Sequence, residues 1–168
     1  GMPLDSIRYD LCRVSFDVAT EKLGAPEIVF QASAQSKSVS FPCISPNGKY
    51  LMFVLSDYGN FSIWHQEADL YLANLQDGTV VPLESANSNN VESYHSWSSN
   101  GRWVVFSSRQ ENGLYTQPFI AYIDENGQAH KPFLLPQKDI QYYDKLMKSF
   151  NVPEFVSGKV QTDGYSIS

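Results

Sequence analysis

The stretch YHSWSSNGRWVVFSSR (residues 94–109) repeats the pattern of FPCISPNGKYLMFVLS (residues 41–56). Both segments begin with an aromatic residue and carry a serine, an Asn-Gly pair, a basic residue and then an apolar run with a phenylalanine. Asn-Gly favours the positive φ angles of a two-residue hairpin turn, and the flanking residues are rich in aromatic and β-branched types. Each copy therefore predicts a strand, a tight turn and a second strand.

Two further matched pairs of segments follow these hairpins. DLYLANLQDG (residues 69–78) and FIAYIDENG (residues 119–127) alternate like strands and end in turns that contain glycine. VVPL (residues 80–83) and KPFLL (residues 131–135) each contain a proline, which indicates an edge strand. Each repeat is therefore predicted to have four strands.

A partial copy precedes both repeats. RYDLCRVSF (residues 8–16) and PEIVFQ (residues 26–31) match the third and fourth strands, and the first two strands of this copy are missing from the chain. Four antiparallel strands that recur about every 50 residues are typical of β-propeller blades, with a β-sandwich as the alternative. We therefore expect an all-β fold, a partial β-propeller of about two and a half four-stranded antiparallel blades with a short C-terminal helix.

The expected boundaries follow from this pattern. Residues 1–136 hold the blades, namely a partial blade at 5–35, a blade at 36–86 and a blade at 91–136, and residues 137–168 form a C-terminal helix and tail. Residues 137–151 are predicted to form a helix, because their apolar residues fall on one stripe: Ile140, Tyr143, Met147 and Phe150. This helix packs on the last blade or docks a partner. Residues 158–168 are a tail or a strand added to the edge of another chain.

Composition excludes several classes of function. The chain has 168 residues, 12 Lys and Arg, and a formal charge of −6, which argues against a nucleic-acid partner. No apolar run is long enough to predict a membrane span, and the N-terminus lacks the pattern of a signal peptide. Cys12 and Cys43 lie outside any CxxC motif, so no cofactor is predicted. They are expected to be buried free thiols, with a disulfide between them as the alternative.

Catalysis and metal binding are not expected. Ser96 and Ser98 lie beside His95, but adjacent residues of a strand point to opposite faces, so His95 is a poor base for Ser96. No serine lies in a Gly-x-Ser-x-Gly motif, and the histidines show no paired spacing that would hold a metal with nearby acidic residues. The chain is therefore predicted not to be an enzyme, with no catalytic and no metal-binding residue.

Two groups of residues remain as candidates for binding a ligand or partner. His95 aligns with Pro42 and is not required by the repeat, so it forms a polar site near the propeller axis or stabilises a turn. Its expected companions in the first case are Ser96, Arg102 and Arg109. Residues 57–68 form a long loop in which Phe61, Ile63 and Trp64 cover a hydrophobic rim, or in which Trp64 and His65 belong to a binding loop.

The phrase FPCISPNGKYLMF (residues 41–53) resembles the Ser-Pro-Asp-Gly-Lys core of TolB-like, WD-repeat-like β-propellers, with Asn47 in place of the usual Asp. The second copy has Ser99 in place of the proline. SYHSWSSNGRW and NVPEF look like the branch found in exported or cell-envelope proteins of bacteria. The resemblance implies a non-enzymatic protein-interaction scaffold in the periplasm or cell envelope, and supplies no catalytic residue. The alternative is an accessory propeller of an exported hydrolase or peptidase whose catalytic domain lies outside this chain.

The number of predicted blades raises a question of closure. Closed propellers have about four to eight blades, and an open array leaves faces and strand edges uncovered. The chain is a fragment of a longer propeller, or it associates with a second copy, or its C-terminal segment covers an open face. We predict a homodimer that associates through its open blades, and a monomeric mass in light scattering at micromolar concentration would contradict it.

Overall fold

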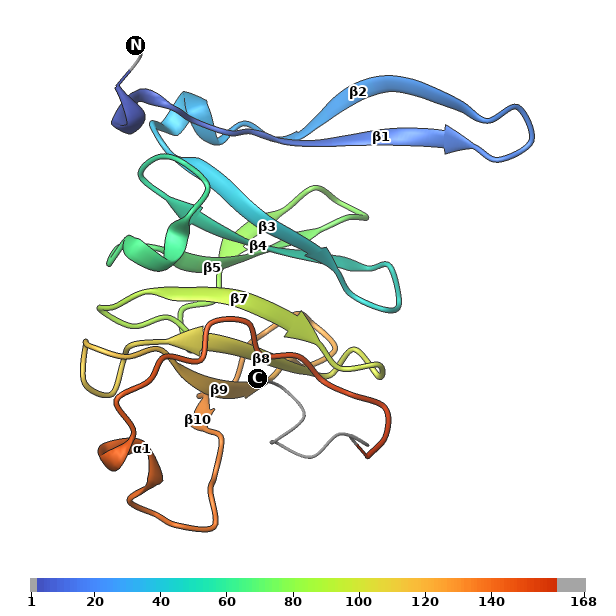
Figure 1. Ribbon diagram of the computed structural model, residues 1–168. Coiled ribbons are helices and arrows are strands. Elements are labelled where there is room, and N and C mark those ends of the chain that lie inside the picture. The colour runs from blue at the N-terminus through green and yellow to red at the C-terminus, as the bar shows by residue number, and fades with distance from the viewer. Residues whose placement is uncertain (1–2, 160–168) are drawn as a thin grey trace.

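The computed structural model describes residues 3–159, which form three antiparallel sheets (Figure 1). A hairpin comes first, with strands β1 (Leu11–Asp17) and β2 (Lys22–Phe30). The second sheet contains β3 (Ser38–Ile44), β4 (Tyr50–Ser56), β5 (Asp69–Asn74) and β6 (Val80–Pro82). The third contains β7 (Glu92–Trp97), β8 (Trp103–Ser108), β9 (Gln117–Tyr122) and β10 (Phe133–Leu134). The helical elements are short: η1 (Leu4–Ser6), η2 (Ala32–Gln35), η3 (Ser62–Trp64) and α1 (Tyr142–Lys145).

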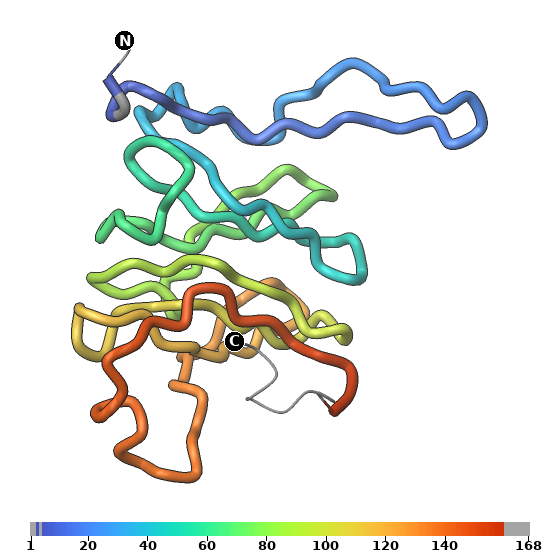
Figure 2. The backbone as a smooth tube through the Cα atoms, viewed as in Figure 1, coloured from blue at the N-terminus to red at the C-terminus, as the bar shows by residue number. Residues whose placement is uncertain are grey.

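The three sheets lie one above another in chain order, as the ribbon and the tube show (Figures 1 and 2). In both complete sheets each strand pairs with its neighbours in sequence, from β3 to β6 and from β7 to β10. Two four-stranded blades and a two-stranded hairpin confirm the prediction of an all-β, partial β-propeller of about two and a half blades.

The first strand of each complete blade carries a β-bulge at the same point of the repeat. The register shifts between Ser40 and Cys43 in β3, and at the equivalent place in β7. The inserted residues Phe41 and Tyr94 have left-handed φ angles of 52° and 49°, which are uncommon for residues other than glycine. Their rings lie 4.6 Å apart between centroids. The two copies therefore also share a β-bulge, which the sequence pattern did not predict.

The Asn-Gly turns differ from the prediction of a two-residue turn. The N–H of Ser45 donates to the carbonyl of Tyr50, so the loop between them has four residues, and only Gly48 has a positive φ, 68°. The Asn47 Oδ1 accepts from the Ser45 hydroxyl at 2.8 Å and from the Lys49 N–H at 3.0 Å. The second copy forms the same bonds, which explains why serine and asparagine recur together.

Equivalent residues of the two blades face the same way. Phe53 in β4 packs against the hairpin, and its counterpart Phe106 in β8 packs into the core between the two complete sheets. The neighbouring residues Met52 and Val54 point into that same core from the other side. Each blade thus turns one face to the preceding unit and the opposite face to the following one, so the stack of sheets has a direction.

The predicted helix over residues 137–151 is wrong in extent. Only Tyr142–Lys145 is helical, and Ile140 and Met147 of the expected apolar stripe are 93% and 80% exposed. The Tyr143 hydroxyl donates to the carbonyl of Leu135 at 2.9 Å, and the backbone becomes extended at Leu146. Hydrogen bonds to the last blade therefore replace the helix that the local pattern favours.

Residues 149–155, here called the C-terminal strap, lie against the third sheet. The Phe150 N–H donates to the Thr116 carbonyl at 2.9 Å, and the Ser107 hydroxyl reaches the carbonyls of Phe150 and Asn151 at 2.6 Å and 2.9 Å. Ser107 is the counterpart of Val54 in the repeat. Val54 lies in the second sheet, and its side chain faces the third sheet. The strap therefore occupies the face of the third sheet that points away from the second. The remainder of the predicted tail, residues 160–168, lies outside the described residues.

We expect Ser107→Ala to lower the free energy of unfolding by about 1–2 kcal/mol, because a buried donor to two carbonyls is lost. The matched control is Ser40→Ala, since the Ser40 hydroxyl is equally buried in a strand but has no hydrogen-bond partner among residues 3–159. That variant should be as stable as the parent or more so. Urea denaturation measures both, and equal losses in the two variants would contradict this role of the strap.

Both cysteines are free, but the expectation of two buried thiols is wrong. Cys12 is exposed and Cys43 is partly buried. Cys12 lies on the face of the hairpin that has no blade packed on it among the described residues. No helix within residues 3–159 has the length and apolar character needed to cross a membrane.

Candidate binding surfaces

His95 lies in the bulge of β7, where its side chain is buried. Its Nε2 is 3.0 Å from the Met52 carbonyl, and because a carbonyl only accepts, Nε2 carries the proton. His95 thus donates from the bulge of the third sheet to a backbone carbonyl of the second sheet. Burial lowers the pKa of His95 to about 4, although the bond to Met52 acts in the opposite direction. The ring is therefore neutral near pH 7, and Nδ1 has no hydrogen-bond partner among the described residues.

A cleft of about 290 Å³ borders His95 and Ser96. It lies between the bulged strands and the strap, and Phe41, Pro42, Val152 and Pro153 also line it. The structure thus keeps His95 and Ser96 together, and adds the strap to them. The hydrogen bond of His95 reaches the neighbouring sheet instead of a turn.

Glu92 is a buried polar residue that the sequence analysis missed. Its carboxylate accepts from the backbone N–H of Ser88 at 3.0 Å, from the Ser88 hydroxyl at 2.7 Å and from the Ser108 hydroxyl at 2.7 Å. Burial raises the pKa of Glu92 to about 7, although these donors act in the opposite direction. The repeat could have indicated that Glu92 is buried, because Glu92 aligns with the buried apolar residue Val39.

Arg109 and the loop between β4 and β5 come together at one end of β8. The Arg109 guanidinium lies 5.5 Å from the centroid of the Trp64 ring, a cation–π contact. His65 instead contacts Glu67, with Nδ1 2.9 Å from Oε1, and packs edge-on against Tyr58. One reading of this loop predicted that Phe61, Ile63 and Trp64 cover a hydrophobic rim. Of the three only Ile63 packs into the core, while Trp64 is 77% exposed and Phe61 is also exposed.

Arg102 lies at the opposite end of β8, beside the Asn-Gly turn. Its Nη2 is 3.4 Å from Oε1 of the exposed Glu125. Arg102 therefore does not join His95 and Arg109 in one polar site near the axis. The six predicted binding residues fall into three separate places: His95 with Ser96, Arg109 with Trp64 and His65 of the β4–β5 loop, and Arg102 by itself.

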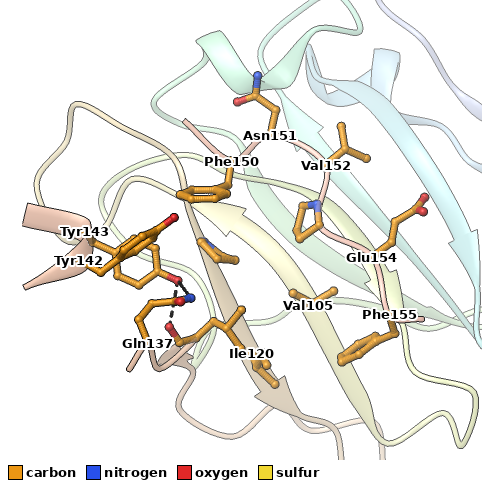
Figure 3. A pocket seen from close by; sticks show the side chains of 13 residues that line it. Val105, Ile120, Gln137, Tyr142, Tyr143, Phe150, Asn151, Val152, Glu154 and Phe155 are labelled. Atoms are coloured by element: carbon orange, nitrogen blue, oxygen red, sulfur yellow. Dashed lines mark hydrogen bonds between the residues drawn. The ribbon is translucent and has the colours of Figure 1, made fainter. Parts of the chain in front are cut away.

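A cleft of about 420 Å³ lies between the strap and the outer face of the third sheet (Figure 3). Tyr143 closes one end, because its hydroxyl accepts from Gln137 Nε2 at 2.9 Å and its ring packs edge-on against Phe150. Burial raises the pKa of Tyr143. The rest of the lining is mostly apolar: Val105, Pro118, Ile120, Leu135, Val152 and Phe155.

The hairpin presents a second apolar surface. Three cross-strand pairs share the face that points away from the second sheet, because Leu11, on the opposite face of β1, is buried against that sheet. These pairs form the apolar hairpin face: Cys12 with Ile28, Val14 with Pro26 and Phe16 with Leu23. Val14, Phe16, Leu23 and Ile28 are 46–73% exposed. The tip of the hairpin also extends beyond the other sheets (Figures 1 and 2).

Among residues 3–159, no group of three or more His, Cys, Asp or Glu side chains is placed to hold a metal ion. The sequence predicted no metal site, and that remains a prediction for the whole chain.

Among known proteins, the chain matches solved structures only. No family model matches the chain, and no curated protein matches it. Among solved structures, it is similar to the β-propeller domain of the Trilobed protease from Pyrococcus furiosus, with a TM-score of 0.44 and 14% identity. The match covers 76% of this chain and 39% of the other, so this chain spans well under half of that structure's length.

Proposed function

We propose that this chain is a non-enzymatic β-propeller segment that binds other proteins through its apolar hairpin face. The observation that carries the proposal is the exposure of Val14, Phe16, Leu23 and Ile28 on one face of a two-stranded sheet. Soluble proteins seldom expose contiguous apolar surface, and such patches usually mark sites of protein interaction. Only the Leu11–Phe30 end of the hairpin packs on the second sheet, so a partner on the exposed part would add stability to a two-stranded sheet that is marginal by itself.

A scaffold of the TolB-like kind in the bacterial cell envelope is the setting we propose. It is supported by the resemblance of residues 45–49, Ser-Pro-Asn-Gly-Lys, to the repeat core of those propellers. The periplasmic location rests on that resemblance alone.

The non-enzymatic part of the proposal is supported by what the candidate nucleophiles and base contact. His95 is buried and bonded to Met52, while the Ser98 hydroxyl donates to Asn100 Oδ1 at 2.7 Å within the turn. Ser96 follows His95 directly in β7, but the ring does not bond it, because Nε2 donates to Met52 and Nδ1 has no partner among the described residues. These side chains thus have structural roles that need no catalytic explanation.

A photo-crosslinking phenylalanine analogue at position 16, compared with position 61, tests the proposal. Phe61 is the matched control because it is the same residue type with a similar exposure, 66% against 57%. In an extract of the producing organism, we expect a defined protein adduct at position 16 only. With that protein purified, Phe16→Asp should weaken binding by about tenfold or more, as for an apolar residue at the centre of an interface. Phe61→Asp should leave it unchanged, and identical adducts at both positions would argue against the hairpin face.

A further inference from the structure

The strand β1 has one unpaired edge. Within residues 3–159 it pairs with β2 alone, whereas its counterparts β5 and β9 each pair on both sides. An edge strand of seven residues exposes backbone N–H and C=O groups that readily accept another strand. The hairpin also extends beyond the second sheet, so the tip end of this edge is accessible (Figure 1).

The sequence of β1 is complementary to itself in the antiparallel direction. With a two-fold axis at Ser15, Arg13 of one copy lies opposite Asp17 of the other, and the same pair recurs on the other side of the axis. Val14 then lies opposite Phe16 on the apolar hairpin face. Oppositely charged and apolar–aromatic cross-strand pairs both stabilise antiparallel strands.

Neighbouring registers lose this match. Moving the axis to Val14 places Arg13 opposite Ser15 and Asp17 opposite the buried Leu11, while moving it to Phe16 places Asp17 opposite Ser15. Only an axis at Ser15 pairs both charges of the strand. Arg13 is also free to make a second contact, because its ion pair with Glu27, at 2.7 Å, is largely exposed.

We propose that two copies of this chain pair through β1 to form a continuous four-stranded antiparallel sheet, in the order β2-β1-β1-β2 with the axis at Ser15. Four strands is the number that each of the other two sheets reaches. Such an interface is isologous and closes at two copies. The inference rests on the proposed function in one respect, since pairing joins the two apolar hairpin faces into one broader surface for a protein partner.

Two charge-reversal variants test the pairing, each alone and as an equimolar mixture. Arg13→Asp places Asp opposite Asp17 twice, and Asp17→Arg places Arg opposite Arg13 twice, so each variant should dimerise more weakly by on the order of tenfold. In the mixture every pair is Asp with Arg, so heterodimers should form with an affinity near that of the parent. Analytical ultracentrifugation over a range of concentrations measures all three samples.

The matched controls change net charge equally at exposed positions off the hairpin, Lys131→Asp and Glu84→Arg, and should dimerise like the parent. Asp17 also accepts from the N–H groups of Ala19 and Thr20, so Asp17→Arg loosens the turn. Far-UV circular dichroism checks that each variant is folded, and recovery in the mixture is a result that misfolding cannot give.

Three results would overturn the inference: a monomeric parent protein, dimers that ignore the charge reversals, or a mixture that associates no better than its components. A monomeric parent that still forms the Phe16 adduct would overturn the self-pairing and leave the proposed function standing, and protection of β1 amides by that partner would assign the edge to a foreign strand. If dimerisation recovers in the mixture but no adduct forms at position 16, the self-pairing stands and the proposed function is overturned.

Discussion

The stability of the Glu92→Gln protein should rise with pH between about 4 and 6.5, and that of the His95→Gln protein should fall between about 4.5 and 7. Burial raises the pKa of Glu92 from 4.5 to about 7. Between these values the folded state binds more protons than the unfolded state, so the contribution of Glu92 to stability is lost as pH rises. At about 1.4 kcal/mol for each pKa unit, the loss is on the order of 3 kcal/mol.

His95 acts in the opposite sense. Burial lowers its pKa from 6.5 to about 4, so the folded state binds fewer protons than the unfolded state in that window. Its contribution is therefore gained as pH rises, with a similar magnitude of roughly 3 kcal/mol. In the parent protein the two effects oppose each other from about pH 4.5 to 6.5, and stability should change little.

Urea denaturation at several pH values across this window separates the two residues. Glu92→Gln leaves the His95 effect alone, and His95→Gln leaves the Glu92 effect alone, so the curves of the two variants should have slopes of opposite sign. Burial also raises the pKa of Asp69, but that carboxyl is common to all three proteins and cancels in the comparison. Parallel curves would show that one or both side chains are solvated in the folded state.

The largest loss of stability is expected at two equivalent phenylalanines. Phe53→Ala and Phe106→Ala each remove a fully buried ring, which should cost about 3–5 kcal/mol. The cores affected differ, because Phe53 contacts the cluster that holds the hairpin and Phe106 contacts the cluster between the two blades. Hydrogen exchange at equal denaturant should therefore show faster exchange in β1 and β2 for Phe53→Ala than for Phe106→Ala.

Phe133→Ala is the control for both variants, because this ring is 47% exposed at the edge of the third sheet. Its effect should be a fraction of theirs. Equal hydrogen-exchange patterns in the two core variants would contradict the assignment of each ring to its own core.

The repeat made most of the fold predictable, because strand alternation and Asn-Gly pairs are local signals. What escaped prediction depends on contacts between distant segments. The helix pattern at residues 137–151 is genuine, but bonds from Tyr143 and the strap to the third sheet outweigh it. Cys12 has apolar neighbours in the sequence, yet it is exposed because nothing among residues 3–159 packs on its face of the hairpin.

The candidate site was less predictable for the same reason. The alignment shows that the repeat does not require His95, but its bond to Met52 depends on the stacking of two blades. Glu92 stands where the preceding repeat has the apolar Val39. The sequence alone therefore indicated a carboxylate at a position expected to be buried. Arg102 and Arg109 are seven residues apart on one extended segment, so their separation could have been foreseen from strand length.

The direction of the stack has a consequence for how these molecules assemble. If the hairpin face of one molecule met the far face of the third sheet of another, the contact would be heterologous and each addition would create the site for the next, giving a filament. The strap already covers that far face, and Ser107, where the preceding repeat has Val54, is bonded to it. We therefore expect this end not to accept a further copy, and the Ser107 bond is one of several contacts that hold the strap in place.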